Sequence, residues 1–390
     1  MNRLLLAFLA VVSVVLAACS AQAPSPSAAP STPASPSASP KPSVGETPSP
    51  APSEPVVVGW EAASVPQTAN ASGVAAIVRG RDGLVAISSD GAFGTLVWVS
   101  ADGRTWTDVT PDGFESVGIA SVVEYEGMLV GVGRGNTIDI ETEEAAVYLS
   151  EDGVSWRKVE TAEPMVGQLI DVIATDDGLY AVGGVPGADA AAVWRSTDGE
   201  TWERAGGDIE HAFLWSIAEG GPGLVAVGWR RDPDPSAAVW TSTDGTQWTL
   251  SPDPEGYELF EGTDVTEIDG TLVMVGSSFT SQGGRFWTST DGVEWAIAEA
   301  PGIDEAYPRN LVHTSSGVVA VGASEAMAGT AWISQDGIGW APFGEPLPGT
   351  YFHSGFADDG ALLAFGATQE GTLETGIEAH AMIWSTALTD

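Results

Sequence analysis

The sequence predicts an all-β fold, a seven-bladed β-propeller built from four-stranded antiparallel blades. The first observation is a Ser-x-Asp-Gly-x-x-Trp motif that occurs six times, at residues 100–106, 150–156, 196–202, 242–248, 289–295 and 334–340. A seventh copy begins at Trp384-Ser385-Thr386. The copies recur about every 45–50 residues, which is the size of one propeller blade. The second observation is a short apolar run bounded by glycine, such as residues 178–183, that precedes each copy.

Each repeat contains the elements of one blade in order. In the third full repeat, a first strand near residues 170–174 is followed by an Asp-Gly turn and a second strand at 178–183. A variable loop leads to a third strand that ends at Ser196, and a fourth strand opens with Trp202. Short apolar runs between glycines are typical of strands that are buried on both faces. Asp-Gly between two such strands predicts a hairpin, because glycine adopts positive φ without strain.

The two ends of the repeat array predict how the ring closes. The last repeat ends after its third strand, and residues 56–61 resemble a fourth strand without a blade. Pairing the two segments places Trp60 where Trp340 stands in the preceding blade. It also removes an exposed sheet edge, which closed β folds need to avoid. The predicted number of blades is therefore seven.

The aspartates of the six motifs are expected to be structural. A carboxylate in this position can accept hydrogen bonds from the backbone N–H groups of the turn. Calcium ligation or a chemical role is the alternative interpretation. These residues are Asp102, Asp152, Asp198, Asp244, Asp291 and Asp336.

The first 19 residues predict export and lipid attachment. Arg3 precedes an apolar run from residue 4 to residue 16, and Leu16-Ala17-Ala18-Cys19 closes it. This arrangement is typical of a signal peptide and is too short to span a membrane comfortably. The ending resembles the lipobox of bacterial lipoproteins, which implies that Cys19 carries the lipid and becomes the new N-terminus. An ordinary secretory signal is the alternative.

Residues 20–54 consist almost entirely of Ala, Pro and Ser. Such a composition buries too little apolar surface to offset its ordering entropy, so we expect a disordered linker. The domain organisation is thus a lipoprotein signal peptide at 1–19, a linker at 20–54 and the propeller at 55–390. The implied location is the bacterial cell envelope, outside the cytoplasm.

Composition excludes several classes of partner and cofactor. The chain has 390 residues and a formal net charge of −39, with 14 Lys and Arg against 53 Asp and Glu. Nucleic acid is a poor partner because phosphate binding needs a basic surface. Cys19 is the single cysteine, so the folded part has no disulfide and no cysteine-based metal site. His211, His313, His353 and His380 show no metal-ligand spacing, and we expect no metal and no cofactor.

Candidate ligand-binding residues lie in the segments that differ between repeats. In a propeller, these segments form the connections at one mouth of the ring, and binding residues are often carried by loops on a rigid scaffold. Aromatic and arginine side chains on one rim are typical of sugar or peptide binding. The alternative is that they are solvated loop residues. The candidates are Arg134, Trp229, Arg230, Arg231, Tyr257, Tyr307, Arg309, Tyr351 and His353.

The repeated motif resembles the Asp-box (BNR) repeat of sialidase-like propellers. The resemblance covers residues 55–390, although each copy here is one residue shorter between Asp and Gly. It implies a propeller fold and raises sialidase activity as an alternative, in which three of Arg134, Arg230, Arg231, Arg285 and Arg309 would grip a carboxylate and one of Tyr257, Tyr307 and Tyr351 would act as nucleophile. The chain departs from that family because no Phe-Arg-Ile-Pro-like segment precedes the first motif and because seven blades exceed the usual six.

The sequence as a whole favours a membrane-anchored, surface-exposed propeller without catalytic residues of its own. We expect it to be a monomer that binds a glycan, a peptide or another envelope protein. A sialidase-like glycoside hydrolase acting on extracellular glycans is the alternative.

Overall fold

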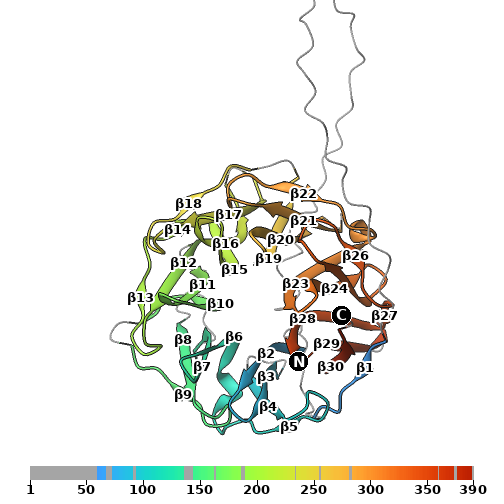
Figure 1. The fold of residues 1–390 in the computed structure, drawn as a ribbon. Helices are drawn as coiled ribbons and strands as arrows, with labels where there is room; N and C mark the ends of the chain where they lie inside the picture. The colour runs from blue at the N-terminus through green and yellow to red at the C-terminus, as the bar shows by residue number, and fades with distance from the viewer. Residues whose placement is uncertain are drawn as a thin grey trace, which may run out of the picture. The chain divides into compact units, whose positions relative to one another are not determined.

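The computed structural model describes residues 59–66, 73–90, 94–135, 144–161, 164–185, 189–232, 234–253, 256–280, 283–358, 360–372 and 376–388. The predicted signal peptide and linker lie outside these ranges. In the described part, seven antiparallel sheets stand around one axis (Figure 1). The predicted seven-bladed β-propeller is therefore confirmed. No helix among the described residues is long and apolar enough to cross a membrane.

Each blade is an antiparallel meander whose first strand is nearest the axis. Blades 1 to 7 begin in chain order with the innermost strands β2 (Gly73–Gly80), β6 (Gly118–Tyr125), β10 (Gln168–Thr175), β15 (Ala212–Gly220), β19 (Phe260–Ile268), β23 (Ala306–Thr314) and β28 (Thr350–Asp358). The second strands are β3 (Gly83–Ser89), β7 (Met128–Arg134), β11 (Gly178–Val185), β16 (Gly223–Arg230), β20 (Thr271–Ser278), β24 (Gly317–Ser324) and β29 (Ala361–Thr372). The third strands are β4 (Thr95–Ser100), β8 (Ala145–Ser150), β12 (Ala190–Ser196), β17 (Ser236–Ser242), β21 (Gly284–Ser289), β25 (Ala328–Ser334) and β30 (Gly376–Ala387).

The outermost strands are very short. They are β5 (Thr107–Asp108), β9 (Arg157–Lys158), β13 (Glu203–Arg204), β18 (Thr249–Leu250), β22 (Ala296–Ala298), β26 (Ala341–Pro342) and β1 (Glu61–Ala62). In blades 3 and 6, β14 (Ile209–Glu210) and β27 (Leu347–Pro348) pair with the rest of the third strand. The single-turn 3-10 helices η1 (Phe114–Ser116) and η3 (Ile303–Glu305) complete the described elements. Outer strands this short leave little free edge for another chain to pair with.

The N-terminal strand closes the ring. Strand β1 pairs with β30, with Glu61 opposite Ser385 and Ala62 opposite Trp384. The pairing begins directly after Trp60, just as every other outer strand begins after its motif tryptophan, and it ends at Ala62, one residue beyond the predicted segment 56–61. The predicted segment 56–58 lies outside the described residues. The Trp60 ring lies 4.9 Å from the ring of Phe352 and 6.2 Å from that of Phe343, so it packs in blade 7 and against blade 6.

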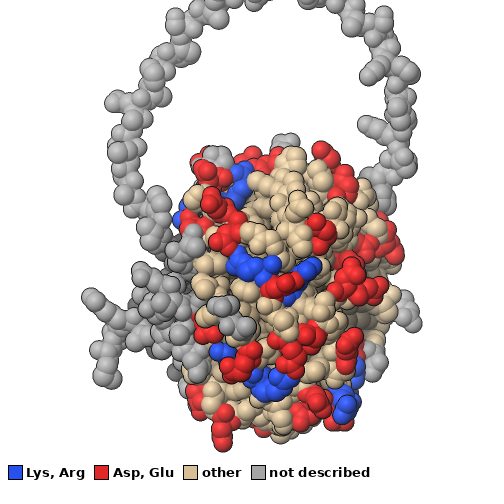
Figure 2. Space-filling model, turned by 90° about the vertical axis from the view of Figure 1, so that its left-hand side faces the viewer, with Lys and Arg blue, Asp and Glu red and all other residues tan. Residues whose placement is uncertain are grey.

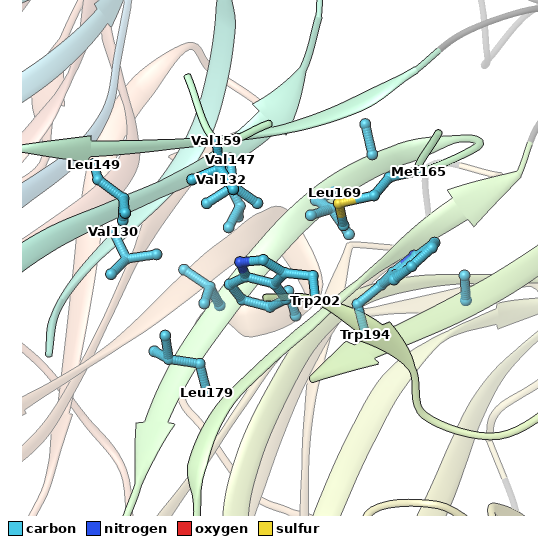
Figure 3. Close-up of a cluster of buried hydrophobic side chains, with 14 of the residues drawn as sticks. Val130, Val132, Val147, Leu149, Val159, Met165, Leu169, Leu179, Trp194 and Trp202 are labelled. Carbon is cyan, nitrogen blue, oxygen red and sulfur yellow. The ribbon is translucent and has the colours of Figure 1, made fainter. Parts of the chain in front are cut away.

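The hydrophobic core lies between neighbouring blades. The cluster in Figure 3 combines Val130 and Leu149 of blade 2 with Leu169, Leu179 and Trp202 of blade 3. Leu179 is fully buried and Leu149 is 1% exposed. Full burial of one such side chain stabilises the fold by about 1.5–3 kcal/mol. Because each core is shared by two blades, no blade buries its apolar faces alone.

The surface is strongly acidic, as the net charge of −39 requires. Figure 2 shows one side of the molecule, on which Asp and Glu outnumber the scattered Lys and Arg. Ion pairs join neighbouring blades on the exterior: Arg157 of blade 2 pairs with Glu200 of blade 3, and Arg79 of blade 1 pairs with Asp358 of blade 7. Exposed pairs of this kind contribute about 0–1 kcal/mol each. Hydrophobic burial, and not surface charge, therefore holds the ring together.

The closing strand gives a direct stability test. A chain that starts at residue 54 should be as stable as the chain that starts at residue 20. A chain that starts at residue 63 lacks Trp60 and β1, and should lose at least about 3 kcal/mol of unfolding free energy in a urea titration. It should also aggregate, because the edge of β30 is left bare.

A matched control is Trp156→Ala, which removes the same motif tryptophan from a blade that is closed by its own chain. It should lower stability without causing aggregation. Equal stability and solubility of the two truncated chains would mean that β1 does not close the ring.

Candidate functional site

The two ends of the propeller carry different segments. One end, called the upper face here, carries the connections between second and third strands and between one blade and the next. The opposite lower face carries the Ser-x-Asp-Gly-x-x-Trp hairpins. This division follows from the antiparallel order of the strands in each blade.

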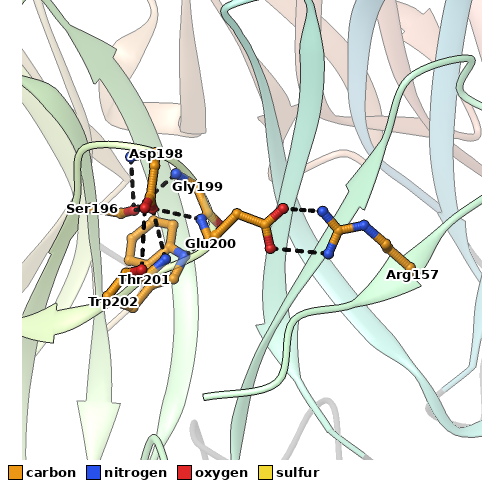
Figure 4. A network of polar contacts seen from close by, with 7 residues as sticks. All are labelled: Arg157, Ser196, Asp198, Gly199, Glu200, Thr201 and Trp202. Carbon is orange, nitrogen blue, oxygen red and sulfur yellow. Dashed lines mark hydrogen bonds and ion pairs between the residues drawn. The ribbon is translucent and has the colours of Figure 1, made fainter. Parts of the chain in front are cut away.

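The lower-face hairpins share one hydrogen-bond pattern, shown for blade 3 in Figure 4. Asp198 Oδ1 accepts hydrogen bonds from the N–H groups of Thr201 at 2.7 Å and Glu200 at 2.8 Å, and from Ser196 Oγ at 3.1 Å. These bonds lower the pKa of Asp198, the Thr201 N–H having the largest effect. The indole N–H of Trp202 donates to the Gly199 carbonyl at 2.9 Å.

The same carboxylate pattern recurs in the other five hairpins. Asp102, Asp152, Asp244, Asp291 and Asp336 each accept from the backbone N–H groups two and three residues further on. In Asp244 these bonds lower the pKa to about 2. Every described hairpin thus uses its carboxylate for the turn itself, which leaves it poorly placed for chemistry on a ligand.

Three of the candidate ligand-binding residues come together close to the axis. Arg309 on β23 and Tyr351 and His353 on β28 lie on adjacent innermost strands, beside Glu261 of β19. Arg309 Nη1 lies 3.9 Å from Glu261 Oε1, and the rings of Tyr351 and His353 meet edge to face at 4.6 Å. The Arg309 side chain is 49% exposed and that of Glu261 only 18%. The guanidinium is thus the accessible half of the pair. These four residues are called the axial cluster.

Arg309 is the positively charged side chain of the axial cluster at neutral pH. His353 is exposed by its accessible surface, yet the strands around it partly desolvate the ring, and together with the charge of Arg309 they lower its pKa to about 4, which favours the neutral imidazole. Enclosure also raises the pKa of Glu261, although Arg309 opposes the shift. The cluster therefore offers a guanidinium, a neutral imidazole and a phenol side by side.

A second group of side chains lies on the upper face of blades 3 to 5. Asp189 accepts from His211 Nδ1 at 3.0 Å and pairs with Arg231 Nη1 at 3.1 Å. Arg231 stacks over the ring of Trp229 at 5.5 Å, and Trp229 meets Phe279 edge to face at 6.5 Å. The hydrogen bond to Asp189 raises the pKa of His211. These five residues are called the rim cluster.

The remaining candidates join neither cluster. Arg230 is only 16% exposed and pairs with Asp253. Tyr307 directs its hydroxyl towards Glu325 at 3.5 Å. Arg134, at the end of β7, lies against Gly118 of its own blade. Tyr257 is 1% exposed and packs edge to face on Trp287 at 5.2 Å.

Tyr257 therefore belongs to the core, whereas the sequence analysis expected it on the rim. Its aromatic side chain fills the space between blades 4 and 5, where burial also raises its pKa well above the ordinary value. A loop position with Gly256 beside it gave no sign of this burial.

The innermost strands carry a further polar group that the sequence analysis did not single out. Ser121, Asp171, Ser216, Asp264, Asn310 and Ser354 each directly follow the β-bulge of their strand. These six residues are called the inner belt. Blade 1 has Ala76 at the equivalent position. Among the residues that the structure describes, no three His, Cys, Asp or Glu side chains lie close enough together to hold a metal ion.

Asp264 is the most heavily bonded member of the inner belt. Its Oδ1 accepts from Ser216 Oγ at 2.6 Å and from its neighbour Val265 N at 2.8 Å. Its Oδ2 accepts from Asn310 Nδ2 and from Leu311 N, both at 2.7 Å. Desolvation raises the pKa of Asp264 to about 7 against these donors, and it also raises the pKa of Asp171.

In blades 2 to 7 a glycine stands opposite the bulge and lets the two backbones approach closely. In blade 4, a Cβ on Gly228 would lie 1.9 Å from the Phe213 carbonyl oxygen, so only glycine fits there. Blades 2 to 7 all have this glycine, and the belt residue stands twelve positions before it, as Ser216 does before Gly228. The constant spacing of a polar residue before the Val-Gly or Phe-Gly pair was the available sequence signal.

The described structure thus defines a class of protein: a closed β-propeller with structural hairpins on one face and, on the other, charged and aromatic clusters carried by strand ends and connections. The chain belongs to the family of the DUF6242 beta propeller domain, whose model matches residues 54–340. A comparison with curated proteins finds no match.

Similar solved structures include the endosialidase of phage phi92, with a TM-score of 0.51 and 10% identity over 86% of this chain and 70% of that one. The acylaminoacyl peptidase of Pyrococcus horikoshii has a TM-score of 0.51 and 10% identity over 82% of this chain and 53% of the peptidase. The sialidase of Trypanosoma rangeli has a TM-score of 0.45 and 13% identity, covering 81% and 59%. The chain therefore spans little more than half of the last two proteins. At such identities the likeness is one of fold.

The raised pKa of Asp264 predicts a pH-dependent effect of Asp264→Asn. The carboxyl binds its proton more tightly in the folded chain (about 7) than in the unfolded chain (3.8). Its contribution to stability is thus present below about pH 4 and lost as the pH rises through about 7. The variant lacks this proton, so its unfolding free energy relative to wild type should be highest near pH 8 and should fall towards about pH 4.5.

The measurement is urea unfolding of both proteins across that range. The difference between them isolates Asp264, because His211 and His353 titrate in both. A difference that stays constant with pH would contradict the raised pKa.

Proposed function

We propose that this chain is a lipid-anchored, non-catalytic binding module whose upper face meets its ligand outside the cytoplasm. The observation that carries the proposal is the state of the upper-face arginines. Arg230 pairs with Asp253, Arg231 with Asp189, and Arg309 with Glu261. Each guanidinium already has a carboxylate partner, which suits a surface that recognises a ligand by complementary shape and paired charge.

The same observation weighs against a sialidase-like hydrolase. A carboxylate clamp of that type needs three arginines that converge on one ligand group, with a nucleophile beside them. Arg230, Arg231 and Arg309 each face a carboxylate of this chain, and Arg285 stacks over Phe260 at 4.8 Å. Of the candidate nucleophiles, Tyr257 is buried in the core. The likeness to sialidases thus supports a shared fold and does not favour a shared reaction.

The chemistry of the two clusters fits a glycan or a peptide. Trp229, Phe279 and Tyr351 offer aromatic surface, which binds sugar rings and apolar side chains alike. Arg231 and Arg309 add charged donors that are held in place by their acidic partners. A polyanion such as nucleic acid would meet a chain of net charge −39 and is disfavoured.

Membrane attachment is the second part of the proposal. It rests on the sequence Leu16-Ala17-Ala18-Cys19 and on the Ala-, Pro- and Ser-rich residues 20–54 that follow. Such a linker, extended at about 3 Å per residue, would let the propeller reach up to roughly 100 Å from the membrane. The closed ring with short outer strands needs no second copy to cover a sheet edge, which supports a monomer.

The binding role is tested by screening the protein against glycan and peptide arrays, followed by titration of the best ligand. Arg309→Ala or Arg231→Ala should weaken binding by roughly tenfold or more, as expected for a contact worth about 1.4 kcal/mol. Arg157→Ala, which removes an arginine paired with an acidic residue on the lower face, is the matched control and should bind normally.

Two results would overturn this proposal. One is equal affinity in all three variants. The other is release of free sugar from a sialylated or other glycan substrate, abolished by Arg309→Ala, which would establish the hydrolase instead.

The lipid anchor is tested by Cys19→Ser. The variant should leave the membrane fraction or accumulate as uncleaved precursor, because two acyl chains anchor a protein far more firmly than one or none. Metabolic labelling with a fatty acid should mark the wild type alone. Unchanged fractionation with no label in either protein would show that Cys19 carries no lipid.

A further inference from the structure

The innermost strands share a bulge that sets the direction of the axial side chains. In each strand one extra residue stands between two residues that pair with the second strand. Arg309 and His353 are the extra residues of β23 and β28, so they occupy equivalent positions in adjacent blades. A bulge redirects a side chain and leaves local backbone groups unpaired by the ladder. Other contacts must therefore hold these two positions.

Asn310 provides those contacts on both sides. Its Nδ2 donates to Asp264 Oδ2 at 2.7 Å, and the next N–H, that of Leu311, donates to the same oxygen at 2.7 Å. These two bonds fix the chain directly after Arg309. The Oδ1 of Asn310 accepts from Ser354 Oγ at 2.9 Å and from Gly355 N at 3.0 Å, which fixes the chain directly after His353.

We propose that Asn310 is a positioning residue that holds Arg309 and His353 in register for ligand binding. The inference rests on the proposed function and names a residue that touches no ligand itself. One amide donates to blade 5 and accepts from blade 7 at the same time. A carboxylate lacks the N–H that faces Asp264, and an aliphatic side chain lacks both groups.

The isosteric variant Asn310→Asp makes the test sharp. It would set a carboxylate against Asp264, with Asp171 further along the inner belt. The other titratable groups of β19, β23 and β28 are Glu261, Glu267, Tyr307, Arg309, His313, Tyr351, His353 and Asp358. Two carboxylates in contact separate unless they share one proton. The variant should thus lose the alignment at neutral or higher pH and recover it in mild acid, whereas Asn310→Ala should lose it at every pH.

The readout is the His353 imidazole signal in NMR spectra of the full chain with labelled histidine. The chain has four histidines, and His353→Gln assigns the signal. In Asn310→Ala the signal should shift, and the pKa of His353 should rise from about 4 towards the ordinary 6.5. The signals of His211 and His380 should stay unchanged. A general loss of stability would instead change the signals of all the histidines.

Ser121→Ala is the matched control. It removes one inner-belt bond, from Ser121 Oγ to Asp171 at 3.0 Å, in blades 2 and 3, away from Arg309 and His353. It should leave the His353 signal in place. An unchanged His353 signal in folded Asn310→Ala, or an equal shift in Ser121→Ala, would overturn the proposal.

This experiment needs no ligand, so its outcome is separate from that of the proposed function. A shifted His353 signal together with normal ligand binding by Arg309→Ala would retain the link through Asn310 and reject the axial cluster as the binding site.

Discussion

The pairing of β1 with β30 joins the first and last strands of the propeller through two residue pairs, Glu61 with Ser385 and Ala62 with Trp384. The ring depends on it because each hydrophobic core lies between two blades and not within one. An open seam would bare the β30 edge and loosen the packing of Trp60 against Phe343 and Phe352. Closure thus gives every blade two neighbours, so that all seven interfaces between blades stabilise the ring.

The inner end of blades 2 to 7 combines a bulge with one tight backbone contact at a glycine. In blade 4, Gly228 lies against the Phe213 carbonyl oxygen at the bulge, and the Ile217 N–H beyond the bulge donates to the belt residue Asp171 of blade 3 at 3.2 Å. Two opposing effects act on the charged form of Asp264. Its burial disfavours the charge, while four hydrogen bonds favour it. Blade 1 carries Ser88 and Ala76 at these two positions and stands outside the belt.

The two faces of the propeller carry different kinds of side chain. On the lower face, carboxylates such as Asp198 are saturated by the turns they stabilise, so that face changes little from blade to blade. On the upper face, the connections differ, and charged and aromatic side chains gather in the axial and rim clusters. A rigid scaffold with variable connections is the usual way in which propellers acquire different ligands, so a shared propeller fold does not by itself imply a shared activity.

The sequence by itself determined the architecture, because the repeat reports local geometry. Each Asp-Gly turn, glycine-bounded strand and motif tryptophan specifies contacts within a few residues, and seven copies specify seven blades. The tertiary structure alone decided which side chains meet. Glu261, Arg309 and His353 are at least 44 positions apart in the chain and come together only because the innermost strands of blades 5, 6 and 7 lie side by side. Tyr257 lies in the connection before β19 and is nevertheless buried, because side chains of blades 4 and 5 surround it and no local sequence pattern describes that contact.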